Sequence, residues 1–502
     1  MSKNLSPSSQ PLYAVIDLGS NSFHMLISRL VADSVQVVDK IKRKVRLAAG
    51  LDANNFLDDR AMARGWECLS FFAERLQDIP PENIKIVATA TLRLAQNSDE
   101  FMQIAQRILG HKVHLISGEQ EAELIYLGVA HTSSCADKRL VIDIGGASTE
   151  LIIGDGFDPI KVCSLDMGCV TFNSNYFACG EFSEQAFGDA IAKASQQLDS
   201  IAGSYKQAGW DVVLGVSGTI QAVAEVIQVQ KLQGGISLSN LLALKQQVIA
   251  CQVIEELNIH GLEAERKPVF APGLAILIAI FQCLSVRDMF VSGGAIREGL
   301  LYELLPDMRD IGIRERTVNG LINRYSIDQV HANKVGEVGK AIFAQLQEPW
   351  QLNDASAELL SNACSLHEIG LLLEYKGNKQ HASYIIEHTD LAGYSALERG
   401  CLKALVSNYK TDLNFESIEQ QGLLAPAQMR RLIVLLRLAV ILSKRRNDSA
   451  MPEITCLAEE HNIIVQLSQQ WLDRHPLIFA ELNQEIEFCQ QLDIFLTIQG
   501  YS

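Results

Sequence analysis

Two segments of the chain share one pattern, a buried strand that ends in an acid and a glycine turn. The first is AVIDLGSNSFHMLI, from Ala14 to Ile27, and the second is LVIDIGGASTELIIG, from Leu140 to Gly154. Strand and helix patterns follow both copies in a similar order. The sequence therefore predicts a duplicated α/β unit, with mixed sheets covered by helices and a ligand-binding cleft between the halves.

The periodicity predicts the following elements. The first half has strands at 14–17, 23–30, 35–40, 84–90 and 113–116, helices at 58–77 and 98–109, and a short helix from Gly118. The second half has strands at 139–144, 150–153, 159–164 and 210–218, a helix at 183–207, and a last strand-turn-helix in MFVSGGAIREGLLYELL. From about Arg309 the chain becomes helical, in AELLSNACSLHEIGLLLEY among others, with a late strand in NIIVQLS. We expect domains at 1–125, 126–308 and 309–455, and a small α/β cap at 456–502.

One uncharged stretch, between Lys267 and Arg287, is long enough to raise the question of a membrane span. Pro272 and Gly273 interrupt its start, so a buried core helix is favoured over a transmembrane helix. The polar N-terminal tail lacks the apolar region of a secretory signal. The 11 cysteines are scattered without a C-x-x-C pair, which is typical of reduced thiols in a cytoplasmic protein.

The net charge of −16 argues against nucleic-acid binding, but it does not exclude a polyanionic small molecule. Such a ligand needs local amide groups, basic side chains or a divalent cation. One basic cluster, Lys42, Arg43, Lys44 and Arg46, fits either a solvated strand edge or part of a binding site.

The two glycine turns favour phosphate chemistry. Gly145 and Gly146 allow close approach to a ligand, and successive amides in such a turn bind anions. An acid such as Asp143 repels phosphate unless a divalent cation lies between them, although Asp also caps turns for purely structural reasons. GVSGT, from Gly215 to Thr219, and SGG, from Ser292 to Gly294, add further glycine turns at strand ends.

This combination resembles the actin-like ATPase superfamily. Within it, AVIDLGSNSFHMLI, ISGEQEAELIYLGV, LVIDIGGASTELIIG, DMGCVTF, GVSGTIQA and SGGAIREGLLYELL resemble the exopolyphosphatase/guanosine pentaphosphate phosphohydrolase family. The segments IKRKVRLAAGL, VATATLRLA and LHEIGL are closer to the guanosine pentaphosphate phosphohydrolase branch. The resemblance implies hydrolysis of the terminal 5′-phosphate of pppGpp to give ppGpp, in the stringent response, with exopolyphosphatase side activity.

The resemblance also implies roles for individual residues. Glu121 is the expected catalytic base, although an acid at a helix start is also favoured by the helix dipole. Asp143, Glu150 and Asp17 are the expected Mg²⁺ ligands, with Asp17 in the outer shell. Arg93 is placed near the terminal phosphate, the alternative being a surface salt bridge. The phosphate-lining residues are Ser20, Asn21, Ser22, Gly145, Gly146, Ala147, Ser148, Gly218 and Thr219.

The helical C-terminal domain resembles the HD-type phosphohydrolase fold. Glu368 follows His367 where the HD signature has Asp, and His381 and His388 do not complete a ligand set, so we expect a decayed metal site. The expected role of this domain is to form a homodimer or to extend a basic channel with Lys444, Arg445 and Arg446. The expected partners are a small-molecule substrate, pppGpp or polyphosphate, with no nucleic acid and no membrane.

Three other functions remain open on the sequence. The first is a dedicated exopolyphosphatase, which chain-length preference distinguishes. The second is an actin- or chaperone-type ATPase, which predicts an adenosine pocket and slow turnover. The third is a non-catalytic alarmone sensor, which predicts binding without phosphate release.

Overall fold

The first half forms a five-stranded sheet in the computed structural model, which describes residues 11–31, 34–52, 54–133, 138–305, 312–389, 391–446 and 453–501. The strand order is β3-β2-β1-β4-β5. β1 pairs antiparallel with β2 and parallel with β4, and β4 pairs parallel with β5. The strands are β1 (Leu12–Leu18), β2 (Ser22–Val31), β3 (Ser34–Lys44), β4 (Ile84–Ala88) and β5 (His114–Leu115).

The second half repeats this topology. Its order is β8-β7-β6-β9-β11-β10, so the first five positions correspond one by one to the first sheet. The matching pairs also have matching directions, since β6 is antiparallel to β7 and parallel to β9, and β9 is parallel to β11. The strands are β6 (Arg139–Ile144), β7 (Thr149–Asp155), β8 (Asp158–Leu165), β9 (Val212–Gly215), β10 (Ile236–Ser237) and β11 (Asp288–Val291). The duplication predicted from the two motifs is confirmed.

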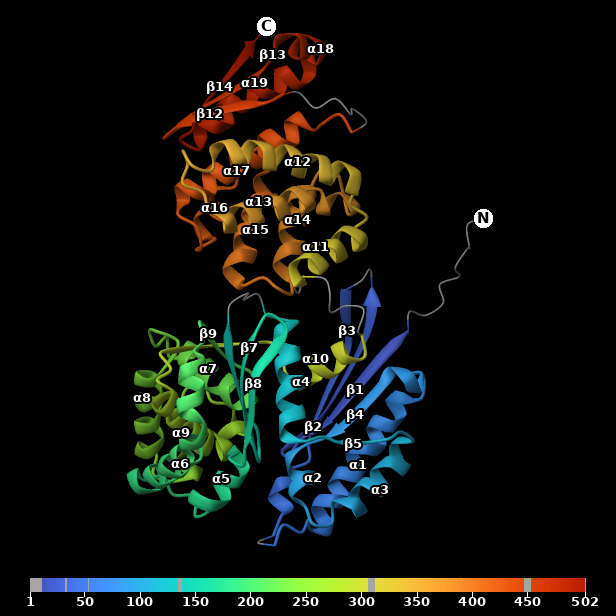
Figure 1. Ribbon diagram of the computed structural model, residues 1–502, viewed down its shortest axis with the longest axis vertical. Coiled ribbons are helices and arrows are strands. Elements are labelled where there is room, and N and C mark those ends of the chain that lie inside the picture. Colours follow the sequence, from blue (N-terminus) through green and yellow to red (C-terminus); the bar gives the residue numbers. More distant parts are fainter. Residues whose placement is uncertain are drawn as a thin grey trace. The chain divides into compact units, whose positions relative to one another are not determined.

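Helices cover the outer face of each sheet (Figure 1). The first half has α1 (Asp59–Leu76), α2 (Ala90–Leu94) and α3 (Ser98–Leu109). The second half has α5 (Cys169–Tyr176), α6 (Glu184–Ala208), α7 (Gly218–Val229), α8 (Leu238–Ala250) and α9 (Lys267–Leu284). By length and composition α9 is apolar enough to cross a membrane, yet its apolar side chains from Phe270 to Phe281 are buried in the core of the second half. The structure therefore places it as a core helix.

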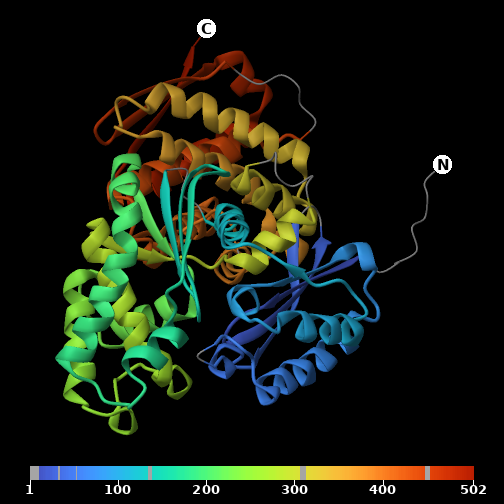
Figure 2. The same ribbon diagram turned by 60° about the horizontal axis from the view of Figure 1, so that its bottom comes forward.

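Two further helices, α4 (Gly118–Ala130) and α10 (Ile296–Glu303), lie between the two sheets (Figure 1), and Figure 2 shows the same layer from another side. They approach closely because glycines face each other's backbone. A Cβ at Gly299 would lie 1.8 Å from the Leu124 carbonyl oxygen, and one at Gly128 would lie 2.0 Å from that of Ala295. The predicted boundary at residue 125 falls inside α4, which is longer than the short helix expected.

The chain divides into two compact units, residues 1–30 with 35–311, and residues 312–502 with 31–34. The second unit contains α11 (Ile313–Arg324), α12 (Gln329–Leu346), α13 (Asp354–Leu366), α14 (Asn378–His388), α15 (Ala396–Asn408), α16 (Phe415–Gln420), α17 (Pro426–Leu442), α18 (Gln469–Arg474) and α19 (Pro476–Gln491). Its three strands, β12 (Thr455–Glu459), β13 (Asn462–Ser468) and β14 (Phe495–Tyr501), form a sheet in the order β12-β13-β14. Cys456, Ile463 and Val465 of this sheet belong to the same hydrophobic core as the helices.

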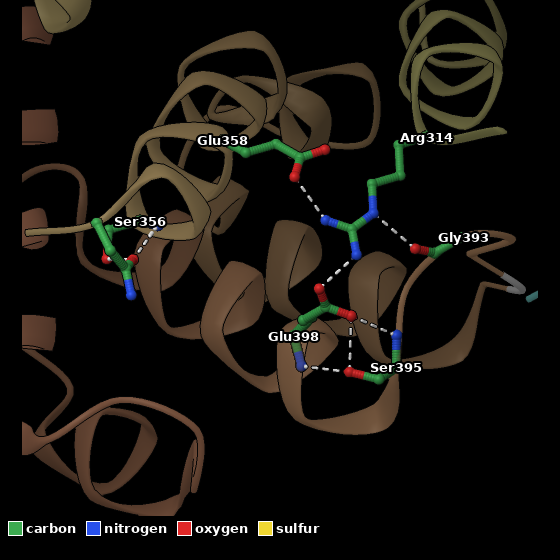
Figure 3. A network of polar contacts seen from close by, with 7 residues as sticks. Arg314, Ser356, Glu358, Gly393, Ser395 and Glu398 are labelled. Carbon is green, nitrogen blue, oxygen red and sulfur yellow. Dashed lines mark hydrogen bonds and ion pairs between the residues drawn. The ribbon is translucent and has the colours of Figure 1, made fainter. Parts of the chain in front are cut away.

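Arg314 of α11 fixes the start of the helical unit (Figure 3). Its guanidinium donates to Glu358 Oε2 at 2.7 Å, Glu398 Oε1 at 2.5 Å and the Gly393 carbonyl at 2.8 Å. The other oxygen of Glu398 accepts from the Ser395 amide and hydroxyl, which completes a capping box at the start of α15. One arginine thus joins α11, α13 and α15.

Candidate active site

Strand alternation explains why three acids face the layer between the sheets. Side chains two positions apart on a strand share a face. Asp17 lies two positions after Val15, Asp143 two positions after Val141, and Glu150 two positions before Ile152. These three apolar residues all belong to the central core around α4 and α10. Asp143 of β6 and Glu150 of β7 also lie directly opposite each other in the antiparallel pair of these strands.

The two glycine turns are in contact. A Cβ at Gly146 would lie 2.8 Å from Ser20 Cβ and 3.5 Å from the Asn21 amide nitrogen. In the first turn the carbonyls of Ser20 and Asn21 accept bonds from Ala48 and from Val45 and Arg46. The amide that follows a carbonyl points the opposite way in a trans peptide. The bonded Ser20 carbonyl therefore turns the next amide, that of Asn21, to the other side of this turn.

The second turn is held in the same way by the start of α5. The carbonyls of Gly145 and Gly146 accept from the amides of Cys169 and Val170 at 2.9 and 2.8 Å. The amides of Gly146 and Ala147 therefore point away from α5, on the side opposite these carbonyls. The structure thus brings the predicted residues of both turns together and provides amides of the kind that bind phosphate oxygens.

Four acids, of which Glu121 and Glu150 are buried, lie close enough to shift one another's pKa. Burial, and next the Glu121 carboxylate, raise the pKa of Asp17 and of Asp143 to about 7 from the ordinary 3.8. Burial, then Glu121 and Asp143, also raise the pKa of Glu150, although Ser148 and Ser164 hydrogen-bond its carboxylate, the latter at 2.8 Å. Asp17 Oδ1 is buried without a hydrogen-bond partner in the structure. Such a group of like charges is best stabilised by a cation.

Glu121 lies in the first turn of α4, whose start is fixed by a capping box between Ser117 and Gln120. Burial raises the pKa of Glu121, and the nearby Arg93 guanidinium lowers it. Arg93 Nη1 lies 2.7 Å from Glu121 Oε2 and also donates to the Ile116 carbonyl at 3.1 Å. Arg93 therefore forms a partly buried ion pair with the expected base, which differs from the surface salt bridge considered from the sequence.

The hydroxyls expected to line the phosphates have different surroundings. Ser22 Oγ is buried without a partner in the structure, as a ligand-binding hydroxyl would be. Thr219 Oγ1 instead donates to the Ile144 carbonyl at 3.3 Å, so its hydroxyl ties the start of α7 to β6. Beside it the Arg266 guanidinium lies against Gly218, with Nη2 at 2.4 Å from where a Cβ would be.

The sequence reasoning missed several cations at this site. Arg297 at the start of α10 lowers the pKa of Asp17 and Asp143, and its Nη1 lies 3.4 Å from His24 Nδ1. Burial, then Arg297, Lys42 and Arg266, lower the pKa of His24 to about 3. Arg297 lies three positions after Gly294 of the SGG turn, but no sequence pattern indicates that it lies beside His24.

The basic cluster of β3 is divided between two faces. Burial, then Arg266, Lys44 and Arg297, lower the pKa of Lys42. Lys44 pairs with Glu265 at 2.5 Å. Arg43, which points to the other face, lies over the Phe71 ring. Lys42 therefore belongs with the cations of the site, while Arg43 does not.

The helical unit contains a separate group of metal-ligating residue types. His331 of α12, His367 and Glu368 have ligand atoms within 4.8 Å of one another. The Glu368 carboxylate forms an ion pair with Arg446, whose Nη2 lies 2.5 Å from Glu368 Oε1. His381 and His388 lie apart from this group, near Glu374 and Tyr384. His331 was not identified from the sequence.

The basic run expected to extend a channel is bonded within the helical unit. Lys444 pairs with Glu481, and Arg446 with Asp328 and Glu368. Arg445 Nη1 lies 2.9 Å from His475 Nε2. Each of the three basic residues therefore has a polar partner within the helical unit, and their role in a basic channel stays a prediction.

Comparison with known proteins identifies the family. The Ppx/GppA phosphatase family matches residues 26–308, and the Ppx/GppA phosphatase domain III matches residues 313–486. A guanosine-5′-triphosphate,3′-diphosphate pyrophosphatase of Pseudoalteromonas translucida is 47% identical over 94% of this chain and 95% of its own length. The protein of the same name from Aeromonas hydrophila is 47% identical over 96% and 97%.

Two solved structures share this fold over 59% of the chain. An exopolyphosphatase from Cytophaga hutchinsonii superposes with a TM-score of 0.54 at 24% identity, over 59% of this chain and 98% of that one. A Ppx/GppA family member from Aquifex aeolicus gives a TM-score of 0.50 at 23% identity, over 59% and 98%. The family matches and the full-length relatives together show that this chain belongs to the Ppx/GppA phosphatase family.

Proposed function

We propose that the chain hydrolyses the terminal 5′-phosphate of guanosine 5′-triphosphate 3′-diphosphate, giving the tetraphosphate and inorganic phosphate. The observation that carries this proposal is the position of Glu121. Its buried carboxylate lies near three further acids, beside the two glycine turns, which contact each other. The relatives that match nearly the whole chain at 47% identity carry the name of this activity.

The chemistry follows from these groups. A water oxygen attacks the terminal phosphorus, the bond from that phosphorus to the bridging oxygen breaks, and the water proton passes to the Glu121 carboxylate. The amides of the two turns bind the phosphate oxygens, and Lys42, Arg266 and Arg297 offset the charge of the remaining phosphates.

The donor set fits Mg²⁺, because oxygen ligands with an unpartnered buried carboxylate oxygen suit a hard cation. Asp143, Glu150 and Asp17 would hold it, and when bound it would neutralise phosphate charge. We further propose a cytoplasmic location and a role in the stringent response. The described cysteines are free thiols, which supports a reducing compartment. The homodimer stays a prediction, which light scattering of the full chain checks.

The test is phosphate release from pppGpp, ATP and long-chain polyphosphate, with and without Mg²⁺. Replacing Glu121 by Gln should lower the rate on pppGpp by about 10²–10⁴-fold, the usual contribution of a positioned base. Glu123→Gln is the matched control, since this exposed acid lies on the same helix. Preference for polyphosphate would instead favour an exopolyphosphatase, preference for ATP an actin- or chaperone-type ATPase, and binding without release an alarmone sensor.

A further inference from the structure

The helical unit contains a large pocket that none of the candidate active-site residues lines. Its volume is about 1070 Å³. It is formed by α14, the segment after α15 (residues 409–414), α17 and α19. This volume is at the upper end of the range for small-molecule sites, and it is large enough for a nucleotide.

The pocket has more cations than its acids neutralise. Arg437 is paired with Glu485 and Lys444 with Glu481. A third lining acid, Glu387, is paired with Lys403 outside the pocket. Among the remaining lining residues, the positive charges of three lysines, Lys376, Lys379 and Lys410, exceed the single negative charge of Asp412. In a chain of net charge −16, such a local surplus of positive charge points to an anionic ligand.

Lys379 and Lys410 are half-buried, which makes an unneutralised ammonium costly. Lys379 Nζ donates to the carbonyls of Lys410 and Asp412 at 3.0 and 2.6 Å, which uses two of its three N–H donors and does not cancel its charge. Among the described residues, Lys410 has no carboxylate within ion-pair distance, and only Glu368, from farther away, raises its pKa. Burial lowers the pKa of both lysines, and a phosphate group bound beside them would relieve that cost.

Aromatic rings accompany these lysines. Lys410 Nζ lies 5.0 Å from the ring centre of Tyr375 and 5.1 Å from that of Tyr409. Tyr375 and Tyr384 are 79% and 63% exposed although both line the pocket. Exposed rings at a pocket beside cations provide a stacking surface for a planar base.

We propose that this pocket is a second ligand site, which binds a purine nucleotide with its phosphates on Lys410 and Lys379 and its base on Tyr375. A long inorganic polyanion fits less well, because it needs a continuous row of free cations and has nothing to stack on the tyrosines. The site is separate from the chemistry of Glu121, so it goes beyond the proposed function.

The experiment is a calorimetric titration of the full-length Glu121→Gln protein with ppGpp. Lys410→Met and Tyr375→Ala, each added to this background, should weaken one site per chain by about tenfold or more, the usual scale for losing one charge-assisted contact. Lys340→Met, an exposed lysine of α12 outside the pocket, is the matched control and should leave the titration unchanged. Tyr375 is exposed, so its variant keeps the test valid if Lys410→Met fails to fold.

Two results would overturn the proposal. One is a titration that neither variant changes. The other is complete displacement of ppGpp by inorganic pyrophosphate together with no effect of Tyr375→Ala, which would make the site one for inorganic phosphate. Failure of the proposed function is distinguishable, because it appears as absence of phosphate release by the native chain and leaves the titration of the pocket intact.

Discussion

Arg93 Nη1 lies 2.7 Å from Glu121 Oε2, so the expected base of the reaction is paired with a cation before any substrate binds. Burial raises the pKa of Glu121, and the arginine opposes that rise. A base must be ionised to accept a proton from water, so this ion pair keeps Glu121 in its working form at lower pH than burial alone would allow.

Replacing Arg93 by Met tests this relationship. Loss of the guanidinium raises the pKa of Glu121 further, so the acidic limb of the kcat/KM profile on pppGpp should move to higher pH. Activity should therefore fall most at the acidic end and recover in part as pH rises. Arg107→Met, an exposed arginine of α3, should leave the limb in place. A uniform loss at all pH values would show that Arg93 contacts phosphate without tuning the base.

Asp17 and Asp143 of the metal-free protein should contribute stability that is lost as pH rises. Asp17 and Asp143 have an ordinary pKa of 3.8 and a pKa of about 7 in the fold. Between these values the two carboxyl groups bind more protons in the folded chain than in the unfolded chain, so their contribution to the free energy of unfolding falls as pH rises through this window. His24, whose pKa burial lowers to about 3, contributes a slope of the opposite sign. In urea unfolding in EDTA from pH 4 to 8, the free energy of unfolding should therefore fall more, or rise less, with pH for the native chain than for Asp17→Asn.

Two controls accompany that measurement. Asp199→Asn, an exposed acid of α6, should leave the slope unchanged. Adding Mg²⁺ at pH 8 should raise the unfolding midpoint of the native chain more than that of Asp17→Asn. Equal slopes for the native chain and Asp17→Asn in EDTA would contradict the clustering of the acids.

Much of the site was predictable because its acids lie at strand ends next to glycines. The boundaries of β6, Arg139 to Ile144, are those expected from the residues. Alternation places Asp17 on the same face of its strand as Val15, and Asp143 on the same face of its strand as Val141. Arg297 was not predictable in the same way, because its neighbour His24 lies 273 residues away. Only the packing of α10 between the sheets brings the two together.

The region after α13 shows a second limit of sequence reasoning. Its apolar pattern continues through Tyr375, yet the helix ends at Leu366. A Cβ at Gly370 would lie 2.0 Å from the Asn378 carbonyl oxygen, so α14 approaches the backbone there. His367 then lies against the Tyr409 ring. Contacts between distant segments override the local helical preference.

Two glycines should respond in opposite ways to alanine. Gly299→Ala brings a methyl group against the Leu124 carbonyl, forces α10 away from α4, and should lower the free energy of unfolding by about 1–3 kcal/mol. Because α4 carries Glu121, kcat should fall as well. Gly188→Ala in α6 meets nothing within 4 Å and should stabilise the protein by up to about 1 kcal/mol. Urea unfolding and phosphate release measure both effects, and equal stability of the two variants would contradict the close helix contact.

Arg437 and Glu485 form a buried ion pair in the helical unit, with side chains 1% and 5% exposed. Arg437 Nε and Nη2 lie 2.5 and 2.9 Å from the two carboxylate oxygens. Arg437→Met leaves Glu485 buried and unpaired, and should destabilise the protein by about 3–5 kcal/mol at pH 8. The loss should shrink toward pH 5, because Glu485, whose pKa burial already raises, takes up a proton more readily without the arginine.

Two variants separate this charge effect from simple loss of packing. Arg75→Met removes an exposed ion pair in which Arg75 Nη2 lies 3.0 Å from Asp39 Oδ2. It should lower the free energy of unfolding by about 1 kcal/mol or less. Arg437→Met combined with Glu485→Met removes both buried charges and should regain part of the stability, although Arg437 also donates to the carbonyls of Asn408 and Thr411. If the double variant is as unstable as Arg437→Met, the arginine stabilises the unit through these carbonyls and its packing on Phe488, and the charge of Glu485 is of little consequence.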